Sequence, residues 1–321
     1  MDRAHPHLSI VGDLGVDLVM GSIAEWPQVG TELILPRSEM RAGGSGANTA
    51  LVMRHLGRPV QLIAAVGDDD FGRWLAAQLH GVQADLQTCR SSTTLSVGLM
   101  HACGERNFFT TQGHLELMDA AHVRARWQAQ PAPRSIALFT GSFLLPGLRA
   151  QYAELLREAA QNGYQVALDT GWPSQGWSEA LRAELRPWLA HVDHLLINET
   201  EALHLAASTE LDAAMRHIAT LLKPGASLVV KVGAKGAIGL SAGQRIEQGA
   251  VPAQVFDSIG AGDSFNAGYL AARLQGADLA QALASGCRVA QAVLARFPRA
   301  TIAPGELAAC LQPAAFNEVA A

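Results

Sequence analysis

The sequence contains few of the features that mark metal-binding, redox or nucleic-acid-binding proteins. No two of its four cysteines form a CxxC pair; they are Cys89, Cys103, Cys287 and Cys310. This spacing argues against a cysteine zinc site or a redox motif and indicates free thiols in a reducing compartment. Charged residues make up only 17% of the 321 residues, and the formal charge is −5. Such a mildly acidic chain gives no support for nucleic-acid binding.

Long apolar runs are also missing. No stretch approaches the roughly 20 residues that a membrane-spanning helix needs, and the N-terminal segment MDRAHPHLSIVGD lacks the apolar core of a signal peptide. We therefore expect a cytoplasmic protein with no membrane partner. Hydrophobic residues account for 49% of the chain, which is enough for a large core. No linker or internal repeat is evident, so we expect one domain over residues 1–321.

Short apolar runs alternate with helical patterns along most of the chain. The runs lack the in-and-out alternation of half-exposed strands, which is typical of strands covered on both faces. They occupy residues 8–13, 60–67, 135–141, 164–170, 194–198 and 227–233. Several helical patterns between them end at a glycine, as helices often do. The alternation predicts an α/β protein with three layers and a mostly parallel sheet.

Two segments interrupt this alternation. Residues 15–42 and 93–112 each contain two β-like runs joined by a turn, which is typical of hairpins rather than of strand–helix units. We interpret them as a small β-sheet lid that leaves the main sheet and covers a site. Two ordinary loops are the alternative.

The stretch DSIGAGDSFNAG at residues 257–268 joins a glycine-rich loop to a helical pattern. Glycines allow successive N–H groups to point the same way, and a helix N-terminus adds unsatisfied donors and a positive dipole end. Gly260, Ala261 and Gly262 therefore form a candidate phosphate pocket. Asp263 would then act as a general base beside the phosphate. The alternative is that Asp263 is only the N-cap of the helix.

Taken with other motifs, this stretch resembles the C-terminal signature of the ribokinase-like carbohydrate kinases, the PfkB family, with Ser258 where threonine is usual. The segment MRAGGSGANTALVMRHLG resembles the family's N-terminal signature. Further matches follow in the family's order: VGDLGVD (11–17), AAVGDDDFG (64–72), NETEA (198–202) and KVGAKG (231–236). The resemblance implies a Rossmann-like domain with a small β lid. It also implies transfer of the γ-phosphoryl group of ATP to a hydroxyl group.

The resemblance assigns roles on the side of the acceptor hydroxyl. Asp263 would be the catalytic base, and the amides of Gly260, Ala261 and Gly262 would form the anion hole. The sugar would contact Asp13, Asp17, Gly43, Gly44, Asn48 and Arg106. Carboxylates suit a polyol because they accept hydrogen bonds from two hydroxyls at once. The alternatives are solvated loop acids for the two aspartates and a plain helix-start turn for residues 43–48.

On the nucleotide side, Asn198 and Glu201 resemble residues that organise Mg²⁺, with Glu201 acting through water. The nucleotide itself would lie against Lys231, Gly233 and Gly236, and Arg288 would lie near the adenine. Asp257 resembles a ligand of a monovalent cation. The resemblance therefore implies ATP and Mg²⁺, and it adds K⁺ as a further candidate.

The substrate depends on three arginines in or beside the two interrupting segments: Arg37, Arg41 and Arg106. If they point inward, a sugar acid or phosphosugar fits, since arginine pairs with such groups. If they point to solvent, a neutral sugar such as ribose or fructose fits. We favour a neutral sugar, with a sugar acid, phosphosugar or nucleoside as alternatives. A sugar- or nucleotide-binding regulator on the same fold is the non-enzyme alternative. The resemblance also implies a homodimer formed through the lid.

Overall fold

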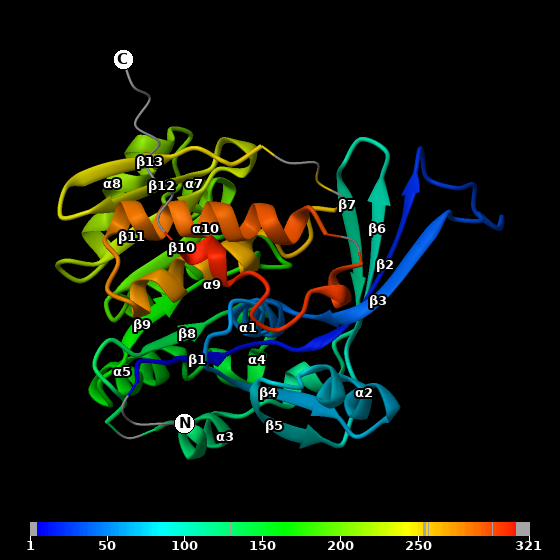
Figure 1. Ribbon diagram of the computed structural model, residues 1–321, viewed down its shortest axis with the longest axis horizontal. Helices are drawn as coiled ribbons and strands as arrows, with labels where there is room; N and C mark the ends of the chain where they lie inside the picture. The colour runs from blue at the N-terminus through cyan, green and yellow to red at the C-terminus, as the bar shows by residue number, and fades with distance from the viewer. Residues whose placement is uncertain (1–4, 129, 253–254, 256, 297, 313–321) are drawn as a thin grey trace.

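The computed structural model describes residues 5–128, 130–252, 255, 257–296 and 298–312. Its main sheet has nine strands in the order β13-β12-β11-β10-β9-β8-β1-β4-β5 (Figure 1). All neighbours pair in parallel except at the end where β12 and β13 are antiparallel. The strands are β1 (Leu8–Val11), β4 (Val60–Gly67), β5 (Gln83–Cys89), β8 (Ile136–Phe139), β9 (Gln165–Leu168), β10 (His194–Asn198), β11 (Ser227–Lys231), β12 (Ala237–Ser241) and β13 (Gln244–Gln248).

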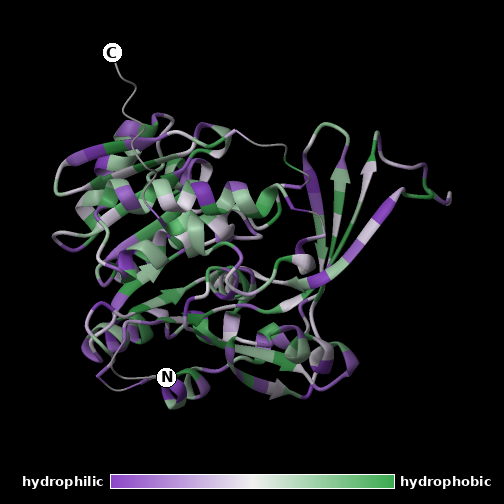
Figure 2. Cartoon of the chain, viewed as in Figure 1, coloured by the Kyte–Doolittle hydropathy of each residue, from purple (hydrophilic) through white to green (hydrophobic). Residues whose placement is uncertain are grey.

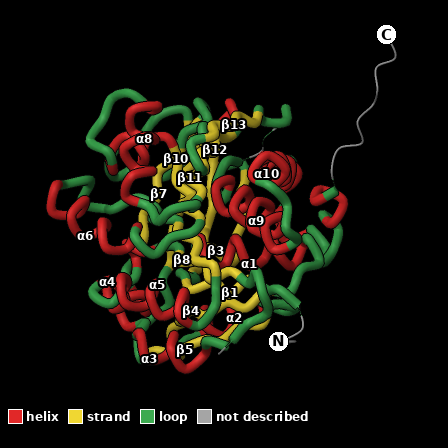
Figure 3. Tube along the Cα trace, turned by 90° about the vertical axis from the view of Figure 1, so that its left-hand side faces the viewer, coloured by secondary structure: helices red, strands yellow, loops and turns green. Residues whose placement is uncertain are grey.

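Helices cover both faces of this sheet, and Figure 3 shows the strands as a middle layer between them. One face packs against α1 (Ser45–His55), α2 (Asp70–Gln78), α9 (Ala261–Leu274) and α10 (Leu279–Leu294). The other packs against α3 (Ala120–Arg126), α4 (Pro146–Arg149), α5 (Tyr152–Gln161), α6 (Glu179–Leu189), α7 (Glu199–Leu205) and α8 (Leu211–Leu221). The central strands β1, β4 and β8 are buried along their whole length and are mostly hydrophobic in Figure 2. The predicted three-layer fold is confirmed, and each predicted apolar run contains a strand.

A second, small sheet projects from one side of the main sheet (Figure 1). Its strand order is β3-β2-β6-β7, and we refer to these four strands as the small sheet. They are β2 (Gly15–Ile23), β3 (Arg37–Gly43), β6 (Leu95–His101) and β7 (Arg106–Thr110). Both predicted hairpins are present as antiparallel pairs, and the parallel pairing of β2 with β6 joins them into one sheet. The alternative of two ordinary loops is therefore wrong.

The chain order of the main sheet reverses beside β1. From β1 the chain runs one way to β4 and β5, and it then returns to β8 on the other side of β1. In open α/β sheets, ligands bind beyond the carboxyl ends of the strands at such a reversal, because the connecting loops diverge there. Polar residues lie at the carboxyl ends of β1 and of three further parallel strands. They are Asp13 after β1, Asp169 after β9, Asn198 on β10 and Lys231 on β11.

Two expectations drawn from absences can be compared with the structure. All four cysteines are free thiols, as predicted. Among the helices of the described residues, none has both the length and the apolar composition needed to cross a membrane. The remaining short elements are the 3-10 helices η1 (Gly113–Leu117), η2 (Ser142–Leu144), η3 (Gly233–Lys235), η4 (Arg299–Thr301) and η5 (Ala308–Leu311).

Candidate active site

Helix α9 begins in the glycine-rich loop that the sequence singles out. Gly260 is its N-cap and has φ 71°, a left-handed conformation that favours glycine. The first helical residue is Ala261, so Asp263 lies in the first turn and is not the N-cap. The N-cap alternative for Asp263 is therefore wrong, and its carboxylate is available to other partners.

The amides at the start of α9 form a donor group. The first N–H groups of a helix have no acceptor within the helix. Of these, the Ala261 N–H donates to Ser258 O at 3.2 Å and the Ser264 N–H to Gly260 O at 2.9 Å. Among the hydrogen bonds of the described residues, the N–H groups of Gly260, Gly262 and Asp263 have no acceptor, so they are available to an incoming anion. The predicted anion hole of Gly260, Ala261 and Gly262 stays a prediction.

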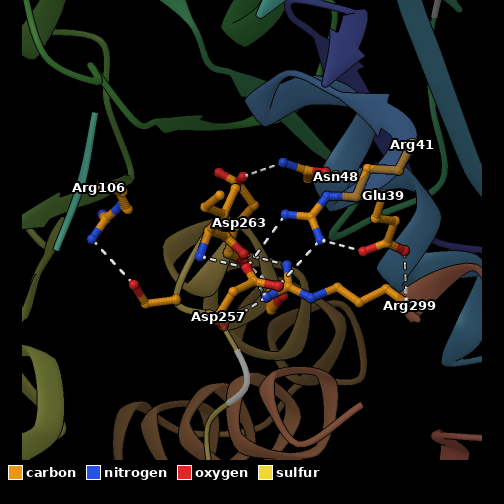
Figure 4. Close-up of polar contacts among 11 residues, drawn as sticks. Glu39, Arg41, Asn48, Arg106, Asp257, Asp263 and Arg299 are labelled. Atoms are coloured by element: carbon orange, nitrogen blue, oxygen red, sulfur yellow. Dashed lines mark hydrogen bonds and ion pairs between the residues drawn. The ribbon is translucent and has the colours of Figure 1, made fainter. Parts of the chain in front are cut away.

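Asp263 is held by Asn48, which the N-terminal motif contributes from α1. The Nδ2 of Asn48 donates to Oδ2 of Asp263 at 2.9 Å (Figure 4). Burial and the nearby carboxylate of Asp169 raise the pKa of Asp263 to about 7, although the Asn48 hydrogen bond lowers it. A carboxylate with a pKa near neutrality is suited to act as a general base.

Two further predicted acids, Asp13 and Asp17, lie under glycine backbone. Their exposed fractions are only 3% and 6%, so the alternative of solvated loop acids is wrong. A Cβ added to Gly43 would lie 2.0 Å from Cγ of Asp17, and one added to Gly141 would lie 2.2 Å from Oδ1 of Asp13. Any larger residue at either position would therefore displace a carboxylate.

Backbone donors and burial set the charge state of these two acids. Oδ1 of Asp13 accepts the N–H of Gly46 at 3.1 Å, at the start of α1. The N-cap of α1 is Gly44, whose φ of 93° favours glycine. Burial raises the pKa of Asp13, and it raises the pKa of Asp17 to about 7 against the opposing charge of Arg41. The pair thus offers acceptors, and on protonation donors, to a hydroxyl compound.

The predicted pair Asn198 and Glu201 forms the start of α7. Oδ1 of Asn198 accepts the N–H of Glu201 at 2.8 Å, and Oε2 of Glu201 accepts the N–H of Asn198 at 2.8 Å. This is a capping box, so the motif stabilises the helix N-terminus. Burial and the neighbouring Asp169 raise the pKa of Glu201 to about 7. A cation bound there would favour its charged form.

Asp169 connects these groups, and the sequence analysis missed it. Its Oδ2 accepts hydrogen bonds from Lys231 Nζ at 2.7 Å and from Asn266 Nδ2 at 2.6 Å. Although burial alone would lower it, the pKa of Lys231 is raised by the carboxylates of Asp169 and Glu201. An acid directly after a predicted parallel strand is the signal that could have found Asp169.

A cavity of about 550 Å³ begins at Lys231 and Gly262 and extends along α10. Its lining includes the predicted Gly233 and Gly236 together with Phe265, Cys287 and Leu294. Such an apolar cavity with donors at one end has the size of a site for an organic ligand. Arg288, predicted near the adenine, does not line this cavity, and its guanidinium donates to Cys310 O and Ser285 Oγ.

A metal ion held only by side chains does not fit the described residues. They include no group of three or more His, Cys, Asp or Glu side chains placed to hold an ion. Glu201 and Asp169 instead supply separate carboxylates near Lys231, and both raise its pKa. Such sparse acids suit Mg²⁺, which keeps most of its waters and shares phosphate oxygens.

Two of the three arginines form hydrogen bonds to the loop before α9: Arg41, which is buried, and Arg106, which is exposed. Arg41 donates to both carboxylate oxygens of Asp257, at 3.3 and 3.4 Å, and to Glu39 at 3.3 Å. Arg106 on β7 donates to Oγ of Ser258 at 3.2 Å (Figure 4). Arg37 is exposed at the start of β3.

Asp257 has a second cationic partner, Arg299, which the sequence analysis did not single out. Nη2 of Arg299 donates to Oδ1 of Asp257 at 2.8 Å and to its carbonyl oxygen at 2.9 Å. Nη1 donates to the carbonyl oxygen of Ile259. Two guanidinium groups therefore surround the carboxylate for which the resemblance implies a monovalent cation.

Comparisons with known proteins identify the family of the chain. Residues 11–302 match the family described as "pfkB family carbohydrate kinase". A nucleoside kinase of Methanothermobacter thermautotrophicus is 27% identical over 277 residues, which cover 85% of this chain and 84% of that protein. A ribokinase of Arabidopsis thaliana is 28% identical over 294 residues, covering 86% of this chain and 73% of that protein.

Solved structures are similar in fold. The Arabidopsis thaliana ribokinase complexed with ribose and ATP superposes with a TM-score of 0.77 at 23% identity, covering 96% of this chain and 99% of that one. The adenosine kinase of Sinorhizobium meliloti superposes with a TM-score of 0.78 at 22% identity, covering 95% of this chain and 99% of that one.

The Asn48 hydrogen bond generates a testable prediction about Asp263. In Asn48→Ala the charged carboxylate loses a donor, so the pKa of Asp263 should rise above about 7. Carboxyl NMR of aspartate-labelled protein would follow this titration. Asn107→Ala, which removes an exposed side chain bonded to His101, should leave it unchanged. An unchanged or lowered pKa in Asn48→Ala would contradict the assignment.

Proposed function

Because the chain belongs to the pfkB family of carbohydrate kinases, phosphotransferases that act on alcohol groups, we propose that it transfers the γ-phosphoryl group of ATP to a hydroxymethyl group of a small neutral carbohydrate such as ribose or fructose. The observation that carries this proposal is the position of Asp263. Its carboxylate lies in the first turn of α9 and has a pKa of about 7. The buried carboxylate of Asp13 is close enough to raise that pKa, and the preceding residue, Gly262, lines the cavity.

In the proposed reaction, Asp263 accepts the proton of the acceptor hydroxyl as its oxygen bonds to the γ-phosphorus. The bond between that phosphorus and the bridging oxygen of ATP breaks, and ADP leaves with the electron pair. The free N–H groups at the start of α9, those of Gly260, Gly262 and Asp263, stabilise the negative charge that moves with the phosphoryl group. Asn48 orients the base through its bond to Oδ2. Asp13, Asp17 and the glycines Gly43 and Gly44 hold the acceptor.

We propose that the nucleotide occupies the cavity beside α10, with its phosphates toward Lys231 and Gly262. Gly233 and Gly236 allow close approach to the base and ribose. Glu201, together with Asp169, would hold the waters of Mg²⁺, which supplies charge neutralisation on the phosphates when bound. Lys231, already protonated beside these acids, adds a fixed positive charge.

The charge around the acceptor supports a neutral substrate. Arg41 is 7% exposed and its guanidinium is already paired with Asp257 and Glu39. Removing one partner of a buried ion pair costs about 3–5 kcal/mol, so Arg41 would not leave Asp257 for a substrate phosphate. An anionic acceptor would instead meet the carboxylates of Asp13 and Asp17, with like charges opposed.

One observation favours the alternative of a sugar acid. Arg106 is exposed, and its described hydrogen bond goes to the neutral hydroxyl of Ser258. Its remaining donors could reach an acidic group on an acceptor held under the small sheet. Arg106 is thus the residue by which an acidic substrate would be recognised if the neutral assignment fails.

We also propose a homodimer formed through the small sheet. Large apolar side chains are exposed on this sheet and its β2–β3 connection: Trp26, Val29, Leu33, Ile34, Met40, Phe108 and Phe109. Apolar groups gathered on one element mark an interaction surface. A second small sheet of the same kind would cover them.

The role of Asp263 is tested by Asp263→Asn. The amide cannot accept the proton, so kcat should fall by about 10²–10⁴-fold, whereas the affinity for a non-hydrolysable ATP analogue should change little. Steady-state kinetics and calorimetry would measure the two quantities. Asp212→Asn, a surface aspartate paired with Arg245, is the matched control and should behave as wild type. An equal loss of nucleotide affinity would mean that Asp263 has a structural role.

The substrate class is tested by ADP formation with Mg-ATP and a panel of acceptors. Ribose and fructose should give higher kcat/KM values than a sugar acid, a sugar phosphate or a nucleoside. Asp17→Asn should reduce kcat/KM for the preferred neutral sugar by about 10-fold or more, because hydrogen bonds to a charged group contribute about 1.5–3 kcal/mol. If the enzyme prefers a sugar acid and loses this preference in Arg106→Ala, the sugar-acid alternative is selected. If no acceptor is turned over, the alternative of a sugar- or nucleotide-binding protein is favoured.

A further inference from the structure

We propose that Arg299 is a positioning residue that supplies a fixed internal positive charge to the loop carrying the anion hole, in place of a dissociable cation. This inference rests on the proposed function, because it concerns how the same loop is held for phosphoryl transfer. Several oxygen acceptors converge on the one guanidinium group of Arg299, and these acceptors lie immediately before α9.

Three oxygens of one short loop bind the Arg299 guanidinium. Nη2 contacts the carboxylate of Asp257 at 2.8 Å and its carbonyl oxygen at 2.9 Å, and Nη1 contacts the carbonyl oxygen of Ile259. The planar fork of an arginine can hold several acceptors at fixed angles. Gly260 follows directly, and a Cβ added there would lie 3.3 Å from Nη1 of Arg299. The guanidinium therefore packs against the N-cap residue of α9 itself.

The guanidinium occupies the position in which a small cation would bind these oxygens. Carboxylate and carbonyl oxygens are the groups that hard cations select. The side chain of Arg299 is 12% exposed and that of Asp257 is 4% exposed, so their ion pair is largely shielded from water. Burial lowers the pKa of Arg299 to about 10, partly offset by Asp257. The group therefore stays protonated at neutral pH and cannot diffuse away.

Arg299 also joins the loop to the small sheet, through its backbone N–H. Glu39 on β3 accepts the N–H of Arg299 through Oε1 at 3.2 Å and the guanidinium of Arg41 through Oε2 at 3.3 Å. Arg41 also binds Asp257. Two arginines and two acids thus form a closed, charge-balanced network between β3, the loop and η4 (Figure 4). Arg299 is its central link because it alone contacts the backbone of the loop on both sides of Ser258.

Arg299→Ala tests this role by kinetics. The anion hole should lose part of its ordering, so kcat should fall by at least tenfold and by as much as about 10²–10³-fold, the effect of losing an oxyanion donor. KM for the acceptor should change by less than about threefold. Millimolar guanidinium chloride, below denaturing concentrations, should restore activity several-fold in Arg299→Ala and not in wild type. Wild-type activity should be equal in sodium, potassium and choline chloride.

Arg296→Ala is the matched control. Arg296 lies three positions away and pairs with Glu306 at the surface, so its removal should leave kcat unchanged. A wild-type kcat in Arg299→Ala, or a loss that guanidinium does not restore, would overturn the inference, as would a requirement of wild type for potassium. If Arg299→Ala does not fold, Arg299→Lys decides. Its single ammonium cannot span the three acceptors, so full activity in that variant would also overturn it.

Amide hydrogen exchange at residues 257–262 gives a readout that needs no activity. The Ile259 N–H donates to Oδ1 of Asp257 at 3.0 Å, and exchange there should accelerate in Arg299→Ala but not in Arg296→Ala. Accelerated exchange in a protein that phosphorylates no hydroxyl compound would refute the proposed function while keeping the ordering role. Unchanged exchange and kcat in an active enzyme would refute the ordering role alone.

Discussion

Burial of carboxylates at the carboxyl edge of the main sheet is the constraint on which the site depends. Asp13, Asp17 and Glu201 are buried and Asp263 is half-buried, and burial is the main reason that the pKa of each is raised. A buried carboxylate is tolerated only with donors nearby. The fold supplies these from backbone N–H groups and from Asn48. The basicity of Asp263 is therefore set by its neighbours, and no single one of them determines it.

The same physics explains which parts of the fold could be predicted from sequence. The strands β1, β4 and β8 are covered on both faces, so they are continuous apolar runs. The strands β5 and β13, with sequences QADLQTC and QRIEQ, lie at the two edges of the sheet, are largely polar and were not predicted. The predicted runs 8–13 and 164–170 overshoot β1 and β9. Their extra residues include Asp13 and Asp169, because site residues follow directly where a strand ends.

The sequence predicted those site residues that lie close together along the chain. The glycine loop before Asp263 and the pair of Asn198 with Glu201 lie within one helix start each, so their spacing carries the signal. Contacts between distant segments leave no such spacing. Asp169 meets Asn266 across 97 positions, and Arg41 meets Asp257 across 216. The sequence offered two directions for the arginines of the small sheet, toward substrate or toward solvent. In the structure Arg41 and Arg106 instead bind residues of the loop before α9, which no sequence pattern indicated.

The contact between Arg41 and Asp257 couples the small sheet to the loop that leads to Asp263. Asp17 and Arg41 stand opposite each other in the register of β2 and β3. Asp17 is one of the acids proposed to hold the acceptor, while Arg41 binds Asp257 in the loop that leads to Asp263. A tilt of the small sheet would therefore move Asp17 and this loop together. The buried ion pairs of Arg41 hold the small sheet and the loop in a fixed relative position. Opposite charges attract more strongly there than at an exposed surface, because little water screens them. The acid proposed to hold the acceptor and the loop proposed to hold the phosphoryl group are thus linked through Arg41.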